Sequence, residues 1–184
     1  MFELLFPFFL IVLFFLVLAI VWRNNARKYI TSGTVASAYD AWTQDKLLER
    51  LWGEHIHLGF YPLGKKNIDF RKAKVQFVHE LVKWSGLDKL PKGSRILDVG
   101  CGIGGSSRIL AKYYGFNVTG ITISPAQVKR ARELTPDRLN CNFQVMDALD
   151  LKFEDGSFDA VWSVEAGAHM NNKTRFADEM MRTL

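Results

Sequence analysis

A short apolar stretch followed by a cluster of glycines constrains the fold of this chain more than any other feature. Residues 95–99 (Arg-Ile-Leu-Asp-Val) have the composition of a buried strand, and residues 100–105 (Gly-Cys-Gly-Ile-Gly-Gly) follow directly. Glycines at this place let the backbone turn sharply into a helix and let a ligand approach closely. The spacing Gly100-x-Gly102-x-x-Gly105 fits nucleotide-binding loops, although a tight turn without a ligand is the alternative.

From residue 94 onward, strand and helix patterns alternate with short connections, which predicts an open, mostly parallel α/β sheet of the Rossmann-like kind. The expected strands are 95–99, 117–121, 141–145 and 158–164, and the expected helices are 106–114, 125–134 and one from 173 to 184. Before this core, short helices are expected at 35–42 and 46–52, and an amphipathic helix at 70–84. The predicted organisation is an anchor at 1–22, a helical cap and substrate-side segment at 23–93, and the α/β core at 94–184.

Residues 4–22 are apolar and uncharged, long enough for one helix across a bilayer core of about 30 Å. A buried core helix and a cleaved signal peptide are the alternatives, but Glu3 at the start and Val21-Trp22 at the end do not suit a signal peptide. Arg23, Arg27 and Lys28 follow the segment, so the rest of the chain is expected on the cytoplasmic side of the membrane.

The charge pattern and the two cysteines exclude several classes of function. The formal charge of +5 is spread among acidic residues, which favours a solvated surface over nucleic-acid binding. Cys101 and Cys141 are too few for a disulfide framework and do not have metal-ligand spacing. No metal site is expected, and the oligomeric state stays open.

The residues around the glycines favour one ligand. A nicotinamide dinucleotide places its diphosphate at the helix N-terminus and needs an acid at the end of the second strand. This chain has Thr122 there and carries its acid before the glycines, at Asp98. A carboxylate at that position repels a diphosphate but suits the cationic amino acid portion of S-adenosylmethionine. S-adenosylmethionine is therefore the predicted cofactor, and a nicotinamide-dependent oxidoreductase is the rival interpretation.

Several stretches carry a family resemblance. Residues 96–105 are similar to class I S-adenosylmethionine-dependent methyltransferases. Residues 120–125 (Gly-Ile-Thr-Ile-Ser-Pro) and 162–170 (Trp-Ser-Val-Glu-Ala-Gly-Ala-His-Met), with 39–42 and 52–59, resemble the prenylquinol methyltransferases of tocopherol and plastoquinone synthesis. The resemblance implies C-methylation of a membrane prenylquinol of the methyl-phytyl-benzoquinol, solanesyl-benzoquinol or tocopherol type. A sterol or a fatty acid is the alternative acceptor. A cyanobacterial origin would place the chain in the thylakoid or plasma membrane.

The resemblance also assigns expected roles to individual residues. Asp98 and the glycines would hold the methionine portion, Thr122 would lie at the ribose, and Glu165 near the donor methyl. The residues expected to bind the cofactor are Asp98, Gly100, Cys101, Gly102, Gly104, Gly105, Thr122, Gln127, Asp147, Ala148 and Glu165.

Two of these assignments have a structural alternative. Gln127 can belong to a capping box in which Ser124 caps a helix with proline at its first position. Asp147, expected with Ala148 at the adenine, can instead cap a helix from residue 148 onward. The residues alone leave the second choice open.

Ring methylation also calls for a base that removes a phenolic proton and raises the electron density of the attacking carbon. His169, after the fourth strand, is the first candidate, and His55 and His57 in the cap segment follow. Class I domains have seven strands, whereas this sequence stops at Leu184 in the helix after the fourth. It is therefore expected to be an N-terminal fragment with an incomplete core. A non-catalytic module that binds S-adenosylmethionine is the alternative function.

Overall fold

The computed structural model describes residues 11–18 and 32–184. The chain divides into two compact units, residues 1–30 and 31–184, and each is described by itself. In the first unit, residues 11–18 form a helix whose side chains are all exposed. No helix within the described ranges is long and apolar enough to cross a membrane. The remaining residues of the predicted anchor lie outside the described part of the chain.

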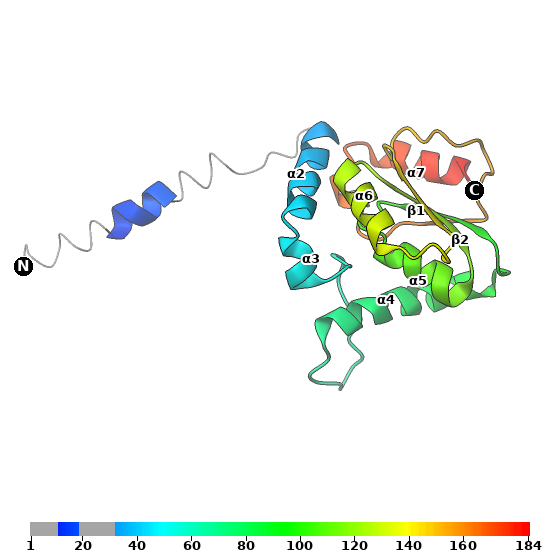
Figure 1. The fold of residues 1–184 in the computed structure, drawn as a ribbon, viewed down its shortest axis with the longest axis horizontal. Coiled ribbons are helices and arrows are strands. Elements are labelled where there is room, and N and C mark those ends of the chain that lie inside the picture. The colour runs from blue at the N-terminus through cyan, green and yellow to red at the C-terminus, as the bar shows by residue number, and fades with distance from the viewer. Residues whose placement is uncertain (1–10, 19–31) are drawn as a thin grey trace, which may run out of the picture. The chain divides into compact units, whose positions relative to one another are not determined.

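The second unit is built on a four-stranded sheet in which every neighbouring pair is parallel (Figure 1). Its strands are β1 (Arg95–Val99), β2 (Asn117–Thr122), β3 (Cys141–Val145) and β4 (Ala160–Trp162), in the spatial order β3-β2-β1-β4. The order reverses between β1 and β4, and such a switch point is where ligands bind in open α/β sheets. The predicted α/β fold is confirmed.

The helices of this unit are α2 (Ser32–Gln44), α3 (Leu47–Trp52), α4 (Phe70–Ser85), α5 (Gly105–Tyr114), α6 (Pro125–Leu134) and α7 (Lys173–Arg182). Two short 3₁₀ helices, η1 (Leu87–Lys89) and η2 (Gly167–His169), follow α4 and β4. The predicted helices at 35–42 and 46–52 correspond to α2, which is longer at both ends, and to α3.

Two apolar clusters hold the sheet between layers of helices. One joins α4 and α5 to the sheet through residues that include Val78, Leu110 and Ile96. The other joins α7 to the opposite face through Phe176, Leu97 and Val99. Because side chains alternate along a strand, Ile96 and Leu97 point to opposite faces, and both are fully buried. Burial on both faces explains why β1 reads as a nearly continuous apolar run.

The fourth strand is shorter than the predicted range of 158–164. Only Ala160–Trp162 pair with β1. The backbone N–H of Phe158 donates instead to the carbonyl of Thr183, at 2.9 Å. Glu165, directly after the predicted range, has a left-handed φ of 55°, far from the dihedral angles of a strand. Tertiary pairing rather than β-propensity therefore sets the strand length.

Candidate functional site

The glycine loop leaves β1 at the switch point of the sheet and is pinned to the neighbouring strand. The backbone N–H groups of Gly100 and Cys101 both donate to the carbonyl of Ile121, at 2.9 and 3.0 Å. Gly100, Gly102 and Gly104 all have positive φ values, between 55° and 80°. Glycine adopts this conformation with little strain, so the sequence supplies the turn that β1 and α5 need.

A methyl group added to each loop glycine would meet a different environment. At Gly104 it would lie 2.7 Å from the Phe143 ring, and at Gly105 2.7 Å from the carbonyl oxygen of Glu54. At Gly100 it would collide with the side chain of Ala166. At Gly102 nothing lies within 4 Å. Gly102 is therefore the loop position whose backbone faces open space, as close approach by a ligand requires.

Asp98 lies in β1 beneath the loop, with only 2% of its surface exposed. Its carboxylate accepts a hydrogen bond of 2.5 Å from the hydroxyl of Ser107 on α5. Burial raises the pKa of Asp98 to about 6, and the Ser107 hydrogen bond only partly opposes this effect. The site thus holds an acidic group whose charge is poorly compensated by the protein. Ser107 was not predicted, because only the first turn of α5 brings it to Asp98.

At the end of β2, two predicted cofactor residues bind each other. The Thr122 hydroxyl donates to Oε1 of Gln127 at 2.7 Å, and both side chains are buried. The Ser124 side chain accepts from the backbone N–H of Gln127 at 3.1 Å, with Pro125 at the first position of α6. The helix cap at Ser124 is confirmed. Gln127 therefore has a structural role at its backbone, while its side chain orients Thr122.

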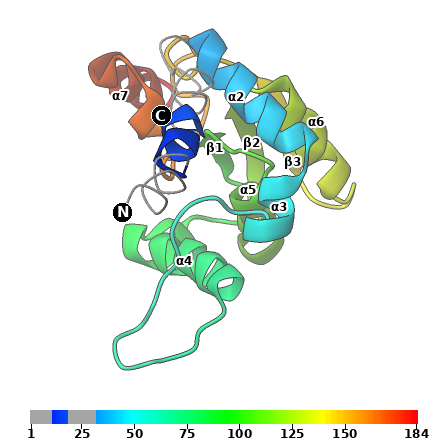
Figure 2. The ribbon, with the colours of Figure 1, turned by 90° about the vertical axis from the view of Figure 1, so that its left-hand side faces the viewer.

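Asp40 of α2 also binds the start of α6, which the sequence did not indicate. Its Oδ1 accepts from the Ser124 hydroxyl and, at 3.0 Å, from the backbone N–H of Ala126. A carboxylate at a helix N-terminus satisfies unpaired N–H groups and interacts favourably with the helix dipole. Asp40 thereby fixes α2 against α6, and Figure 2 shows the two helices side by side.

Asp147 and Ala148 follow β3. Asp147 Oδ1 accepts from the backbone N–H of Leu149 at 2.9 Å, and the N–H of Asp150 donates to its carbonyl. The segment is a turn rather than a helix. The alternative prediction of a helix from Ala148 onward is therefore wrong, because these bonds close a local turn. Ala148 is buried and belongs to the apolar cluster that contains Leu97, Val99 and Ile121.

After β4, the chain contacts the segment that precedes the core. Glu165 is exposed, and its Oε1 accepts from the backbone N–H of Leu58 at 3.0 Å. His169, at the end of η2, is also exposed, and its Nε2 lies 2.9 Å from the hydroxyl of Tyr39 in α2. The cap segment thus contacts the carboxyl side of β4 at two places.

His55 and His57 form a pair whose hydrogen bonds determine their tautomers. His57 Nδ1 lies 2.7 Å from the carbonyl of Leu58, which can only accept, so Nδ1 carries a proton. In the neutral ring His57 Nε2 then accepts, and the donor at 3.0 Å is Nδ1 of His55. Burial is the main cause that lowers the pKa of His55, to about 3, and it also lowers the pKa of His57.

The histidine pair is held against the glycine loop. The His55 ring lies beside Gly105, and the carbonyl of His55 accepts from the buried Lys74 ammonium at 2.7 Å. Glu54 forms an ion pair of 2.6 Å with Arg108 of α5. Both nitrogens of His57 are occupied by protein groups. Of the three predicted bases, His169 is the one that lies exposed after β4.

No group of three or more His, Cys, Asp or Glu side chains within the described residues could hold a metal ion. The predicted cofactor residues lie at the carboxyl ends of three strands: Asp98 and the glycines at β1, Thr122 and Gln127 at β2, Asp147 and Ala148 at β3. Glu165 follows β4 across the switch point. The fold therefore brings Asp98 and Glu165, which are 67 positions apart in the chain, to the same edge of the sheet.

Comparison with known proteins shows what this chain is similar to. Residues 97–184 match the family described as methyltransferase domain. The chain is 58% identical over 184 residues to the 2-methyl-6-phytyl-1,4-hydroquinone methyltransferase of Synechocystis, covering 98% of this chain and 57% of that protein. It is 42% identical to the chloroplastic tocopherol O-methyltransferase of Arabidopsis thaliana, covering 74% of this chain and 42% of that protein. The chain spans about half the length of these relatives.

Solved structures share the fold. The crystal structure of the [4+2]-cyclase SpnF matches with a TM-score of 0.75 and 29% identity, covering 84% of this chain and 57% of that one. A putative sarcosine dimethylglycine methyltransferase from Galdieria sulphuraria matches with a TM-score of 0.70 and 28% identity, covering 79% and 56%. These two proteins are named for different reactions, so the fold alone does not set the chemistry.

Proposed function

We propose that this chain, whose residues 97–184 match the methyltransferase-domain family, binds S-adenosylmethionine at the glycine loop and methylates a ring carbon of a membrane prenylquinol. The identity of 58% to a phytyl-hydroquinone methyltransferase supports this acceptor class. The observation that carries the cofactor assignment is the open space at Gly102 together with the poorly compensated carboxylate of Asp98 directly below the loop.

The residues at the sheet edge fit this cofactor. Asp98 supplies the negative potential that an α-ammonium group and a sulfonium favour, and the Gly102 backbone leaves room for the methionine portion. We assign the Thr122 hydroxyl, which is oriented by Gln127, to the ribose, and Asp147 with Ala148 to the adenine. Thr122 carries no charge, which disfavours a nicotinamide dinucleotide. When bound, S-adenosylmethionine supplies a methyl group that is already activated by its sulfonium.

The protein itself must position the acceptor and remove its phenolic proton. The Tyr39–His169 pair lies beyond β4, on the side where Glu165 is expected near the donor methyl. We assign His169 as the group that accepts the phenolic proton, with Tyr39 holding its ring in place. Removal of that proton raises electron density at the ring carbon that attacks the methyl group. His55 and His57 are hydrogen-bonded to each other, so we assign them the role of holding the cap segment against the glycine loop.

The cap segment and the apolar N-terminus give this proposal its membrane context. Residues 4–22 would hold the chain at the bilayer as a single-pass anchor, with the catalytic unit on the cytoplasmic side. A prenylquinol is dissolved in that bilayer, so anchoring keeps the enzyme near its substrate. Extraction of membranes with alkaline carbonate tests the anchor: release of the chain into the soluble fraction would contradict it.

Calorimetry separates the cofactor alternatives. S-adenosylhomocysteine should bind the intact chain with a stoichiometry of one, whereas NADH should not bind. Incubation of membranes with labelled S-adenosylmethionine and candidate quinols, followed by mass spectrometry, then tests the acceptor. Cofactor binding without any methylated quinol would leave a binding module and overturn the catalytic proposal. Binding of NADH alone would overturn both.

A further inference from the structure

The connection between α3 and α4 has a composition unlike the rest of the surface. From His55 to Ile68 the chain contains no acidic residue, and its two formal charges are Lys65 and Lys66. Its larger side chains are mostly apolar or aromatic. Five of them lie exposed to water: Ile56, Leu58, Phe60, Tyr61 and Leu63. An exposed apolar group of this size usually marks a surface that contacts another molecule.

This connection projects away from the sheet. Figures 1 and 2 both show it looping out beyond α4. At its tip, the backbone N–H of Lys65 donates to the carbonyl of Pro62 at 3.2 Å, and Gly64 has a φ of 79°. These two features define a β-turn with glycine at its third position. The turn places Leu63 at its apex, where its side chain is completely exposed.

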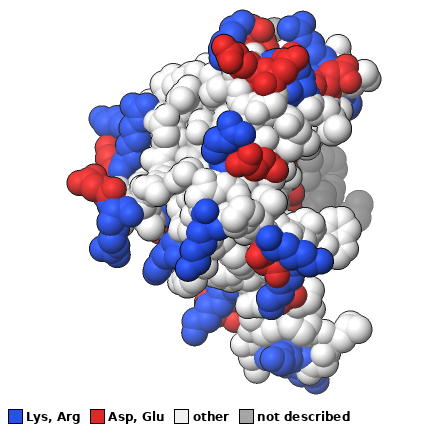
Figure 3. Space-filling view, turned by 90° about the vertical axis from the view of Figure 1, so that its right-hand side faces the viewer, with Lys and Arg blue, Asp and Glu red and all other residues white. Residues whose placement is uncertain are grey.

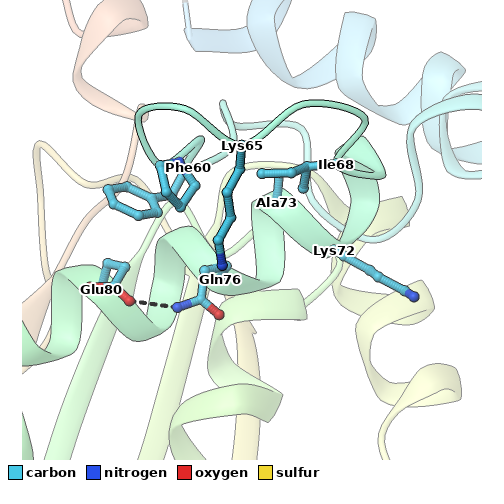
Figure 4. Close-up of a pocket in the computed structure, with 8 residues that line it drawn as sticks. Phe60, Lys65, Ile68, Lys72, Ala73, Gln76 and Glu80 are labelled. Atoms are coloured by element: carbon cyan, nitrogen blue, oxygen red, sulfur yellow. Dashed lines mark hydrogen bonds between the residues drawn. The ribbon is translucent and has the colours of Figure 1, made fainter.

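A cleft separates the turn from α4, so the turn does not pack down onto the protein. The cleft has a volume of about 450 Å³ and is lined by Phe60, Pro62, Ile68 and the two lysines Lys65 and Lys72, with part of α4. Figure 4 shows Lys65 reaching from the loop toward Gln76, which is hydrogen-bonded to Glu80, while the Lys72 side chain extends outward from α4. None of the predicted cofactor residues lines it.

Positive charge continues from the turn into the first turns of α4. Arg71, Lys72 and Lys74 follow Asp69, whose carboxylate caps α4 by accepting from the backbone N–H of Lys72. Lys74 is buried and bound by carbonyl groups, so the exposed lysines are Lys65, Lys66 and Lys72. Figure 3 shows Lys and Arg at the tip of the lower protrusion, beside uncharged surface. Exposed apolar side chains flanked by lysines match the interface of an anionic bilayer.

We propose that the turn around Leu63 is a second membrane contact, which inserts Leu63 and Tyr61 at the headgroup level of an anionic bilayer while Lys65 and Lys66 bind lipid phosphates. Apolar burial and phosphate attraction act together here, and neither requires cofactor binding or methyl transfer. The contact would hold the α/β unit at the bilayer surface independently of residues 4–22.

The test places an environment-sensitive fluorophore on Leu63→Cys in the full chain. Burial raises the pKa of both native thiols, that of Cys141 to about 11, so the new exposed thiol reacts selectively near neutral pH. With vesicles containing phosphatidylglycerol, the emission should shift to the blue. A matched label on Glu154→Cys, an exposed position in the turn before β4, should not respond. The full chain is bound to vesicles in each measurement, as sedimentation verifies.

The lysines provide the second variant. Lys65→Ala and Lys66→Ala should each weaken the engagement of the turn about fivefold, and 0.5 M salt or purely zwitterionic vesicles should weaken it similarly. The absence of a blue shift at position 63 on anionic vesicles would overturn the proposal. A blue shift that stays the same after either lysine substitution and in 0.5 M salt would also overturn it. A shift that depends on protein concentration without vesicles would instead identify a second copy of the chain as the partner and overturn it.

Discussion

The hydroxyl of Tyr39 in α2 lies 2.9 Å from Nε2 of His169 after β4, although 130 residues separate them in the chain. The two rings also meet edge to face, with centroids 5.6 Å apart. The next residue, Asp40, binds the N-terminus of α6. Consecutive residues of α2 thus contact the segments that follow β2 and β4. Through these contacts the cap determines the geometry at the carboxyl edge of the sheet.

The first prediction concerns this pair. His169→Ala should lower turnover of a prenylquinol by about 10²- to 10⁴-fold, the usual contribution of a positioned general base. Tyr39→Phe removes one hydrogen bond and should lower turnover about fivefold. Neither change should alter S-adenosylhomocysteine affinity, because neither residue belongs to the predicted cofactor set. Single-turnover kinetics with calorimetry on the same samples gives both values. Normal turnover of His169→Ala would exclude the base assignment.

Two glycines of the loop should respond differently to the same methyl group. Gly104→Ala would push a methyl group into the Phe143 ring, and overpacking of this kind costs about 1–3 kcal/mol of unfolding free energy. Gly102→Ala meets no protein atom and should cost about 1 kcal/mol, from its left-handed backbone alone. Its effect should fall on S-adenosylhomocysteine affinity, with a loss of about tenfold or more.

Urea denaturation and calorimetry of the two glycine variants together test the distinction. A Gly102→Ala variant that binds with unchanged affinity would show that the ligand does not approach this backbone. Gly104→Ala is the comparison in which the added methyl group meets protein rather than open space, so its loss of affinity should follow its loss of stability.

Ionised Asp98 should lower the free energy of unfolding at neutral pH, although the same charge favours cofactor binding. Its pKa of about 6 lies above the ordinary value of 3.8, so the folded chain holds its proton more tightly than the unfolded chain. The resulting destabilisation is absent below pH 3.8, grows between the two values, and reaches about 3 kcal/mol above pH 6. Asp98→Asn should therefore stabilise the unliganded chain at pH 7.5 but not at pH 3.5, while abolishing cofactor binding.

Thermal denaturation at both pH values, with calorimetry at pH 7.5, checks the Asp98 prediction. Asn keeps an acceptor for the Ser107 hydroxyl, so the comparison isolates the charge. Equal melting temperatures of the two proteins at pH 7.5 would show that the carboxylate carries no electrostatic penalty.

His55 should make the chain sensitive to acid. Its pKa of about 3 lies below the ordinary value of 6.5, so the unfolded chain binds the proton first as the pH falls. The stability present above pH 6.5 declines below it, by about 2 kcal/mol at pH 5. His55→Gln should remove this part of the pH dependence, measured as the difference in urea midpoint between pH 7.5 and 5.0. The background Asp98→Asn removes the opposing titration of Asp98 in the same range.

Asp40 should contribute to stability through the α6 cap. Asp40→Ala leaves the Ser124 hydroxyl and the Ala126 N–H without their acceptor, at a cost of about 1–2 kcal/mol. Asp45→Ala is the matched control, because Asp45 accepts a hydrogen bond from the backbone N–H of Leu47 at the start of the short α3 and lies exposed. Equal effects of the two substitutions on the urea midpoint would contradict the docking role of Asp40.

Local patterns in the sequence predicted most of the α/β core. Residues 95–99 read as a buried strand, and the first three strands and the helices between them lie within one residue of their predicted bounds. The glycine spacing and the Ser124-Pro125 cap depend on backbone conformations that only a few residue types favour. Such features are local, so they can be recognised in the sequence without knowledge of the fold. The fourth strand was predicted too long, because its length depends on distant partners.

The glycine loop, Asp98 before it and Thr122 after the second strand are set by the sequence itself, because the residue types at these positions dictate the local backbone and charge. Only the tertiary structure decided which residues meet them. It placed Ser107 on Asp98, joined Thr122 to Gln127, paired His55 with His57, and brought Tyr39 to His169. Contacts between distant segments follow from how strands pair and helices pack, and no local pattern encodes them.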